Sequence, residues 1–175
     1  MSDNFSACLA IVLREEGGFS NDNLDPGGIT NLGVTLRTWQ AWVGHPVDIN
    51  DMEALTPAVV APLYQRNFWN ADSCAALPAG LDLCVLDFAV NAGPGHSART
   101  LQSMVGATPD GAIGPATLAA VSSHVAQHGL GAAINEFQAA RLQYYQSLGD
   151  WSTFSKGWTN RINTISAAAH NMAGS

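Results

Sequence analysis

Apolar residues recur at helical spacing along most of the chain, and one long segment, residues 17–35, interrupts this pattern. The first helix is predicted over residues 5–16, where apolar residues follow the i, i+3, i+4 rule. Further helices are predicted at about residues 35–43, 56–68, 79–91, 98–105, 115–126, 132–148 and 151–172, with a short turn at residues 51–55. The regular alternation of strands and helices that a parallel sheet requires is absent, so the predicted fold class is mainly α.

The interrupting segment is rich in Gly, Asn and Asp and contains Pro26-Gly27-Gly28. Two short β-prone pieces, Ile29-Thr30 and Gly33-Val34-Thr35, predict a glycine-rich loop or small β-hairpin after the first helix. A polar loop of this kind inside a compact domain is often functional. We therefore expect catalytic residues in or beside it.

The chain is acidic and has few cations. Its 175 residues include 7 Lys+Arg and 14 Asp+Glu, which gives a net charge of −7. Lys156 is the only lysine and the arginines are scattered singly, so the clustered cations that phosphate contacts need are missing and no nucleic-acid partner is expected. An acidic chain also gains no steering toward an anionic surface. Ligand binding is therefore expected to rest on hydrogen bonds and aromatic side chains.

No metal or other cofactor is expected. A chain of this length can fold without disulfides or metal, and the cysteines are predicted to be buried thiols, with a Cys74–Cys84 disulfide as the open alternative. Residues 21–25 have the alternate polar spacing of an EF-hand loop. However, Pro26 and Leu32 stand where that loop needs Gly and Glu.

Glu16 is the first catalytic candidate, because it stands at the end of a helix where the backbone dipole opposes a carboxylate. A frayed, solvated helix end is the alternative. Asp25 follows nine residues later, and a loop of that length can bring it opposite Glu16, with Thr30 and Thr35 close behind. Glycoside hydrolysis needs one protonated acid and one ionised carboxylate that orients water or stabilises positive charge on the sugar. For Asp25, a simple Asp-Pro-Gly turn is the other interpretation.

Several blocks of sequence occur in order along the chain: Glu16–Phe19, Asp25–Thr35, Leu63–Trp69, Asp87–Pro94, Leu101–Gln102, Asp110–Leu118 and Phe154–Trp158. Together they resemble glycoside hydrolase family 108, which comprises bacterial and phage N-acetylmuramidases of the lysozyme superfamily, with its peptidoglycan-binding C-terminal part. The resemblance covers nearly the whole chain.

The resemblance implies that Glu16 is the catalytic acid. Asp25 and Thr30 resemble the aspartate and threonine that phage-type lysozymes use around the attacking water. The spacing to the threonine is one residue shorter here, so Thr35 stays open as the alternative. Glu15 occupies a place where the family often has His, and we expect it to point to solvent, because successive helix side chains point about 100° apart.

Four further residues in these blocks are candidates for substrate binding, each with a structural alternative. Tyr64 and Trp69 could stack on sugar rings or belong to the core. Asn91 could hydrogen-bond an N-acetyl group or cap a helix. Asp87 lies one helical turn before it, and could orient Asn91 or pair with an arginine.

The expected protein is a single lysozyme-like domain over residues 1–175, with catalytic motifs in about residues 1–92 and a helical, peptidoglycan-binding-like half in 93–175. It is expected to be a lysozyme-type, bacteriolytic glycoside hydrolase that cleaves the β-1,4 bond between N-acetylmuramic acid and N-acetylglucosamine. Similarity to phage-type lysozymes, endolysins among them, favours inversion of configuration. A lytic transglycosylase and a non-catalytic peptidoglycan-binding module on the same fold remain alternatives.

The expected partner is the peptidoglycan glycan strand, bound by a monomer. Residues 1–5 show no basic n-region of a signal peptide, and no apolar run approaches the ~20 residues of a membrane span. We therefore expect no membrane insertion, synthesis in the cytoplasm, and action in the periplasm or cell wall after release by another component.

Overall fold

The computed structural model describes residues 4–21 and 28–174. Within these residues the chain forms nine α-helices, two short helical turns and one hairpin of two strands, which confirms the predicted mainly α fold with a small hairpin after the first helix. The α-helices are α1 (Phe5–Glu16), α2 (Leu36–Val43), α3 (Ile49–Glu53), α4 (Pro57–Tyr64), α5 (Leu81–Ala92), α6 (Pro94–Met104), α7 (Pro115–His128), α8 (Leu130–Gln146) and α9 (Trp151–Ala173). The strands are β1 (Thr30–Asn31) and β2 (Val34–Thr35), and the turns are the π-helical η1 (Gln65–Trp69) and the 3-10 η2 (Cys74–Ala76).

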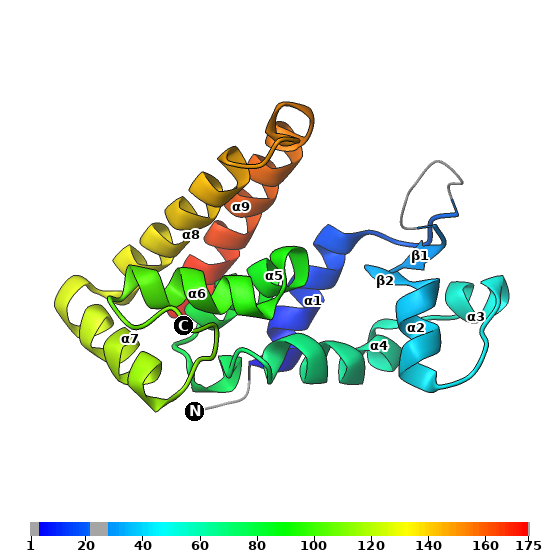
Figure 1. Ribbon diagram of the computed structural model, residues 1–175, viewed down its shortest axis with the longest axis horizontal. Coiled ribbons are helices and arrows are strands. Elements are labelled where there is room, and N and C mark those ends of the chain that lie inside the picture. The colour runs from blue at the N-terminus through cyan, green and yellow to red at the C-terminus, as the bar shows by residue number, and fades with distance from the viewer. Residues whose placement is uncertain (1–3, 22–27, 175) are drawn as a thin grey trace.

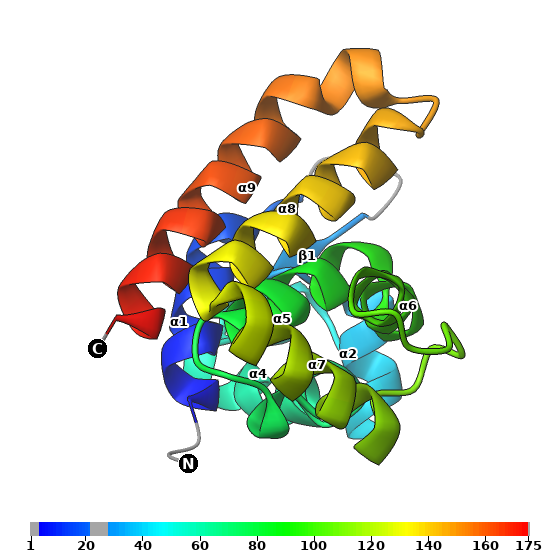
Figure 2. The ribbon, with the colours of Figure 1, turned by 90° about the vertical axis from the view of Figure 1, so that its left-hand side faces the viewer.

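Helix α5 is the centre of the helical part. Every residue from Leu81 to Ala89 is buried, because α1, α6, α8 and α9 pack around this helix. A helix that is largely apolar on all sides is suited to such a position. Helices α8 and α9 form a long antiparallel pair, while the hairpin, α2 and α3 lie together at one end of the molecule and α7 lies at the other (Figure 1 and Figure 2).

The helix predicted over residues 56–68 is α4 followed by the π-helical η1, and two helix starts also differ from the prediction. Residues 51–53 of the predicted turn belong to helix α3, which begins at Ile49 because Asp48 and Asp51 form a capping box. The Asp48 carboxylate accepts hydrogen bonds from the backbone N–H groups of Asn50 and Asp51. Helix α6 begins at Pro94 rather than at residue 98, because proline fits the first helical position directly after Gly93.

Two further properties follow from the packing. All three cysteines are buried, as predicted for thiols, and Cys74 and Cys84 are not joined by a disulfide. Among the described residues, no helix is at once long enough and apolar enough to cross a membrane.

Asp72 is a buried carboxylic acid between η1 and η2. Its side chain is fully buried, and neither carboxylate oxygen has a hydrogen-bond partner among the described residues. Burial raises the pKa of Asp72 to about 7, weakly opposed by the nearby Ser97 hydroxyl. That hydroxyl donates its proton to the Val85 carbonyl at 2.9 Å, so it gives Asp72 little help. The fold therefore favours the protonated form of this side chain.

We expect Asp72 to make the stability of the protein fall as pH rises. In the unfolded chain the group ionises near its ordinary pKa of 3.8, whereas in the fold it ionises at about 7. The contribution of Asp72 to the free energy of unfolding is fully present below the pKa of the unfolded chain. It is lost as pH rises to the pKa in the fold, by about 1.4 kcal/mol per pH unit between the two values.

Urea unfolding at pH 5 and pH 8 measures this effect. The free energy of unfolding should fall by about 2–3 kcal/mol more in the wild type than in Asp72→Asn, which has no carboxyl group at this position. Asp150→Asn is the matched control, because Asp150 is exposed and makes no side-chain cap. An identical pH dependence in the wild type and in Asp72→Asn would contradict the prediction.

Candidate active site

Glu16 is the last residue of α1, and its carboxylate lies between the hairpin and α9. The helix ends there because Gly17 adopts a φ of 79°. Glu16 Oε1 accepts a hydrogen bond from Arg161 Nη2 at 2.6 Å, and the side chain keeps 15% of its surface exposed. The predicted acid is therefore held by an opposite charge, and the alternative of a frayed, solvated helix end is wrong.

The hairpin turn, Leu32–Gly33, approaches Glu16 closely. Both turn residues have positive φ, 50° for Leu32 and 73° for Gly33, as in the type I′ turn that suits a two-residue hairpin. A Cβ atom on Gly33 would lie 2.6 Å from Glu16 Oε2 and 2.6 Å from Tyr64 Oη. Glycine is therefore needed both for the backbone conformation and for the space that the carboxylate fills.

Tyr64, the last residue of α4, holds this turn in place. Its hydroxyl donates to the Leu32 carbonyl at 2.8 Å, and its ring is 1% exposed. Burial first, and then the charge of Glu16, raise the pKa of Tyr64, while Arg161 opposes them. Tyr64 thus stays a neutral donor. The prediction that it stacks on a sugar is wrong, because its ring is buried.

Arg161 of α9 joins Glu16 to the buried Asp87 of α5. Arg161 Nε lies 3.1 Å from each Asp87 carboxylate oxygen, and Nη2 lies 2.6 Å from Asp87 Oδ1 as well as 2.6 Å from Glu16 Oε1. Burial alone would lower the pKa of Arg161, but hydrogen bonds and charges from both carboxylates raise it. One guanidinium thus fixes two carboxylates, a task that its planar fork of donors suits.

A second arginine, Arg141 of α8, lies on the other side of Asp87. Arg141 Nη1 is 2.7 Å from Asp87 Oδ2, an ion pair without hydrogen-bond alignment. Its Nη2 donates to Asn91 Oδ1 at 2.8 Å and its Nε donates to Tyr145 Oη at 3.0 Å. Two arginines and two carboxylates therefore meet in this network, which balances the charges that burial would otherwise penalise.

Asn91 is the exposed end of this network. Its Oδ1 accepts from both Arg141 and the Tyr145 hydroxyl, which lies 3.0 Å away. The side-chain amide is thereby oriented with its N–H group left to donate. Asp87, by contrast, is fully buried, so the prediction that it binds substrate directly is wrong, and of its two alternatives the structure shows pairing with arginine.

The two candidate threonines face each other across the hairpin. Thr30 pairs with Thr35 in the antiparallel register, so both side chains lie on one face of the hairpin. The Thr35 hydroxyl is occupied, because it accepts from the backbone N–H of Thr38 and caps α2. Thr30 makes no side-chain hydrogen bond to any described residue, and the backbone bridge between Ser20 and Thr30 ties the segment after α1 to the hairpin.

Two remaining candidates are not part of this arrangement. Trp69 is 1% exposed and packs against Phe5 with ring centroids 5.5 Å apart, so it belongs to the core and its predicted role in sugar stacking is wrong. Asp25 lies outside the described residues. Within the described part of the chain, no group of three or more His, Cys, Asp or Glu side chains could hold a metal ion.

Arg141, Arg161 and Gly33 were not among the site residues predicted from the sequence. A signal for Arg141 was present, because it follows Ile134 and Phe137 at helical spacing on the buried face of α8. A charged residue on an apolar stripe is almost never fully buried unless it is paired. Such a position therefore predicts a buried acid nearby, although not which acid.

Most of the chain matches known proteins. Residues 9–93 match the family model described as Glycosyl hydrolase 108, and residues 96–163 match the one described as Predicted Peptidoglycan domain. Among solved structures, the chain is similar to Brucella abortus SagA, at 39% sequence identity and a TM-score of 0.84, over 97% of this chain and 95% of that chain. The chain belongs to the glycosyl hydrolase 108 family. No curated protein matches it significantly.

This glycosyl hydrolase 108 protein is accordingly a glycoside hydrolase that acts on peptidoglycan. Its charge network crosses the two matched segments. Glu16 and Asp87 lie in the hydrolase match, whereas Arg141 and Arg161 lie in the peptidoglycan-domain match. The second segment therefore supplies the cations that hold the acid of the first.

Gly33→Ala should reduce the release of reducing ends from peptidoglycan by roughly 10²-fold, because the new methyl group would displace the Glu16 carboxylate and the Tyr64 hydroxyl. The matched control is Gly44→Ala. Gly44 has a similar φ of 78°, and a Cβ atom there would meet nothing within 4 Å. The control carries the same backbone strain, so it should keep its activity. Equal activity in the two variants would contradict a steric role for Gly33.

Arg161→Lys should leave a folded protein with kcat lowered by roughly 10–100-fold. Lysine keeps the charge beside Asp87, but its point-like ammonium cannot hold two carboxylates in one plane as the guanidinium does. Reducing-end release and the thermal midpoint should be measured together. An unchanged kcat would show that the hydrogen bond to Glu16 is not needed for its position.

Proposed function

We propose that this protein is an N-acetylmuramidase that hydrolyses the β-1,4 bond between N-acetylmuramic acid and N-acetylglucosamine, with Glu16 as the general acid. The observation that carries this proposal is the environment of Glu16. The carboxylate is partly exposed, its Oε1 is held by Arg161, and its Oε2 lies beside the hairpin turn. General acid catalysis needs such a combination of access and fixed geometry.

In the proposed reaction, Glu16 gives its proton to the glycosidic oxygen as the bond to the muramic acid ring breaks. Because Oε1 accepts from Arg161, the transferable proton is assigned to Oε2. Positive charge then builds on the anomeric carbon, where water adds and forms the new C–O bond. The proton that this water releases balances the one that Glu16 gave to the leaving oxygen, so Glu16 ends the cycle protonated again. Asp25 is assigned, from the sequence alone, to position this water or to stabilise the charge, and inversion of configuration is expected.

Two polar side chains support these steps. The Thr30 hydroxyl is proposed to hold the attacking water, because the alternative, Thr35, is occupied by capping α2. The Asn91 amide is proposed to donate to the carbonyl oxygen of an N-acetyl group, because its own oxygen is engaged by Arg141 and Tyr145. We place the site of action in the periplasm or cell wall, where peptidoglycan lies, after release by another component.

Glu16→Gln should lower the release of reducing ends from purified peptidoglycan by roughly 10²–10⁴-fold, because the amide cannot donate the proton. Its side-chain oxygen can still accept from Arg161, so the thermal midpoint should change little. Glu15→Gln is the matched control, since it removes the neighbouring acid of the same helix end and should retain activity.

Mass spectrometry of the products separates the alternatives. Hydrolysis gives reducing muramic acid ends, each one water heavier than the anhydro ends that a lytic transglycosylase forms. Equal activity in Glu16→Gln and the wild type would overturn the assignment of Glu16. A wild-type protein that releases no new ends at all would be a binding module on the same fold.

A further inference from the structure

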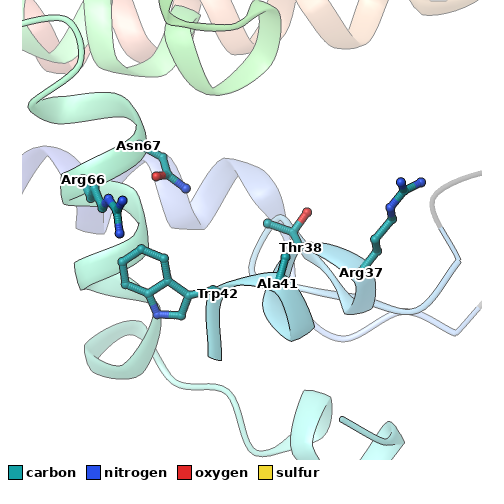
Figure 3. Close-up of a pocket in the computed structure, with 6 residues that line it drawn as sticks. All are labelled: Arg37, Thr38, Ala41, Trp42, Arg66 and Asn67. Carbon is teal, nitrogen blue, oxygen red and sulfur yellow. The ribbon is translucent and has the colours of Figure 1, made fainter. Parts of the chain in front are cut away.

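Arg37 and Arg66, which are far apart in the sequence, line opposite sides of one surface pocket. The pocket has a volume of about 420 Å³ and is called here the arginine pocket. It is lined by Arg37, Thr38, Ala41, Trp42, Arg66 and Asn67. Arg66 and Asn67 project from η1 on one side, Thr38 and Arg37 project from α2 on the other, and Trp42 lies beside Arg66 (Figure 3). Its volume lies within the range of small-molecule binding sites.

The charges of the arginine pocket are available to a ligand. Neither Arg37 nor Arg66 forms an ion pair or hydrogen bond with any described residue, and both side chains are exposed. The guanidinium of Arg66 lies over the Trp42 ring, 5.7 Å from its centroid. Stacking of this kind leaves the edge of the guanidinium free to donate. In a chain of net charge −7, the pocket is thus a local cationic site.

The arginine pocket is built on the same elements as the candidate active site. Helix α2 starts directly after β2, and the Thr38 hydroxyl is 2.9 Å from that of Thr35. On the opposite wall, η1 follows Tyr64, whose hydroxyl lies beside Glu16. A polymer that is bound at Glu16 and runs past Thr35 would therefore reach Thr38 at the wall of the pocket.

We propose that the arginine pocket binds the carboxylate groups of the peptide stems that peptidoglycan carries on its muramic acid residues. The proposal rests on the function proposed above. Guanidinium groups bind carboxylates through paired, charge-assisted hydrogen bonds. In peptidoglycan the sugars with stems attached are neutral, so the carboxylates belong to the peptide. Asn67 and Thr38 can hydrogen-bond the amides of the stem, and the Trp42 ring can cover its small apolar side chains.

A comparison of two walls tests the charge directly. In both, the free amines are acetylated, and in one the stem carboxylates are then converted to amides. The wild type should lose roughly ten- to hundredfold in kcat/KM on the amidated wall. The double variant Arg37→Gln/Arg66→Gln should lose a similar factor on the carboxylate wall and be insensitive to amidation.

The matched control is Arg14→Gln/Lys156→Gln, which removes two exposed positive charges outside the arginine pocket and should behave as the wild type. If, relative to the wild type, the kcat/KM of the pocket variant falls by the same factor on the carboxylate wall and on the amidated wall, the proposal is overturned in favour of sugar binding. A pocket variant that matches the wild type on both walls would overturn it as well.

If the proposed muramidase function is wrong, the result differs from a failure of the arginine-pocket proposal. In that case the wild type releases no reducing ends from either wall. Sedimentation of the Glu16→Gln protein with the two walls then tests the arginine pocket without turnover. We expect the Glu16→Gln protein to bind the amidated wall more weakly than the carboxylate wall. The two pocket substitutions should abolish this difference. Equal binding of Glu16→Gln to both walls would overturn the proposal.

Discussion

The position of Glu16 depends on one guanidinium that holds two carboxylates. Arg161 stands 145 positions from Glu16 in the sequence and contacts both Glu16 and the fully buried Asp87. A buried carboxylate is costly unless it is paired, and Asp87 is paired on both sides, by Arg161 and Arg141. The packing of α5, α8 and α9 is therefore coupled to the position of the acid. The segment that matches a peptidoglycan domain is thus part of the scaffold of the candidate active site as well.

The hairpin supplies the other wall of the site through a turn that few sequences allow. Leu32 and Gly33 both have positive φ, and a leucine in that region is strained. The hydrogen bond from Tyr64 to Leu32 and the buried hydrogen bond from Asn31 to the Met52 carbonyl, at 2.7 Å, hold the turn in this conformation. The backbone can then approach Glu16 more closely than any side chain would permit.

The net charge of the chain hides how its cations are used. The sequence predicted that an acidic protein with scattered arginines gains no electrostatic steering toward an anionic surface. In the fold, Arg141 and Arg161 both pair with the buried Asp87, whereas Arg37 and Arg66 are exposed and line the two sides of one pocket. Long-range steering depends on the total charge. Local recognition depends on where a few guanidinium groups point. The net charge of the chain is negative, whereas the charge at the arginine pocket is positive.

The sequence by itself determined most of the helices and the hairpin after the first helix, and it made Glu16 a candidate, because periodicity, turn residues and helix-end electrostatics are local. Only the tertiary structure decided that Tyr64 and Trp69 are buried, since an aromatic residue on a helix looks the same in sequence whether it faces the core or a ligand. It alone also paired Arg161 with Glu16. That contact depends on which helices pack together, and burial then forces each charge to find its partner.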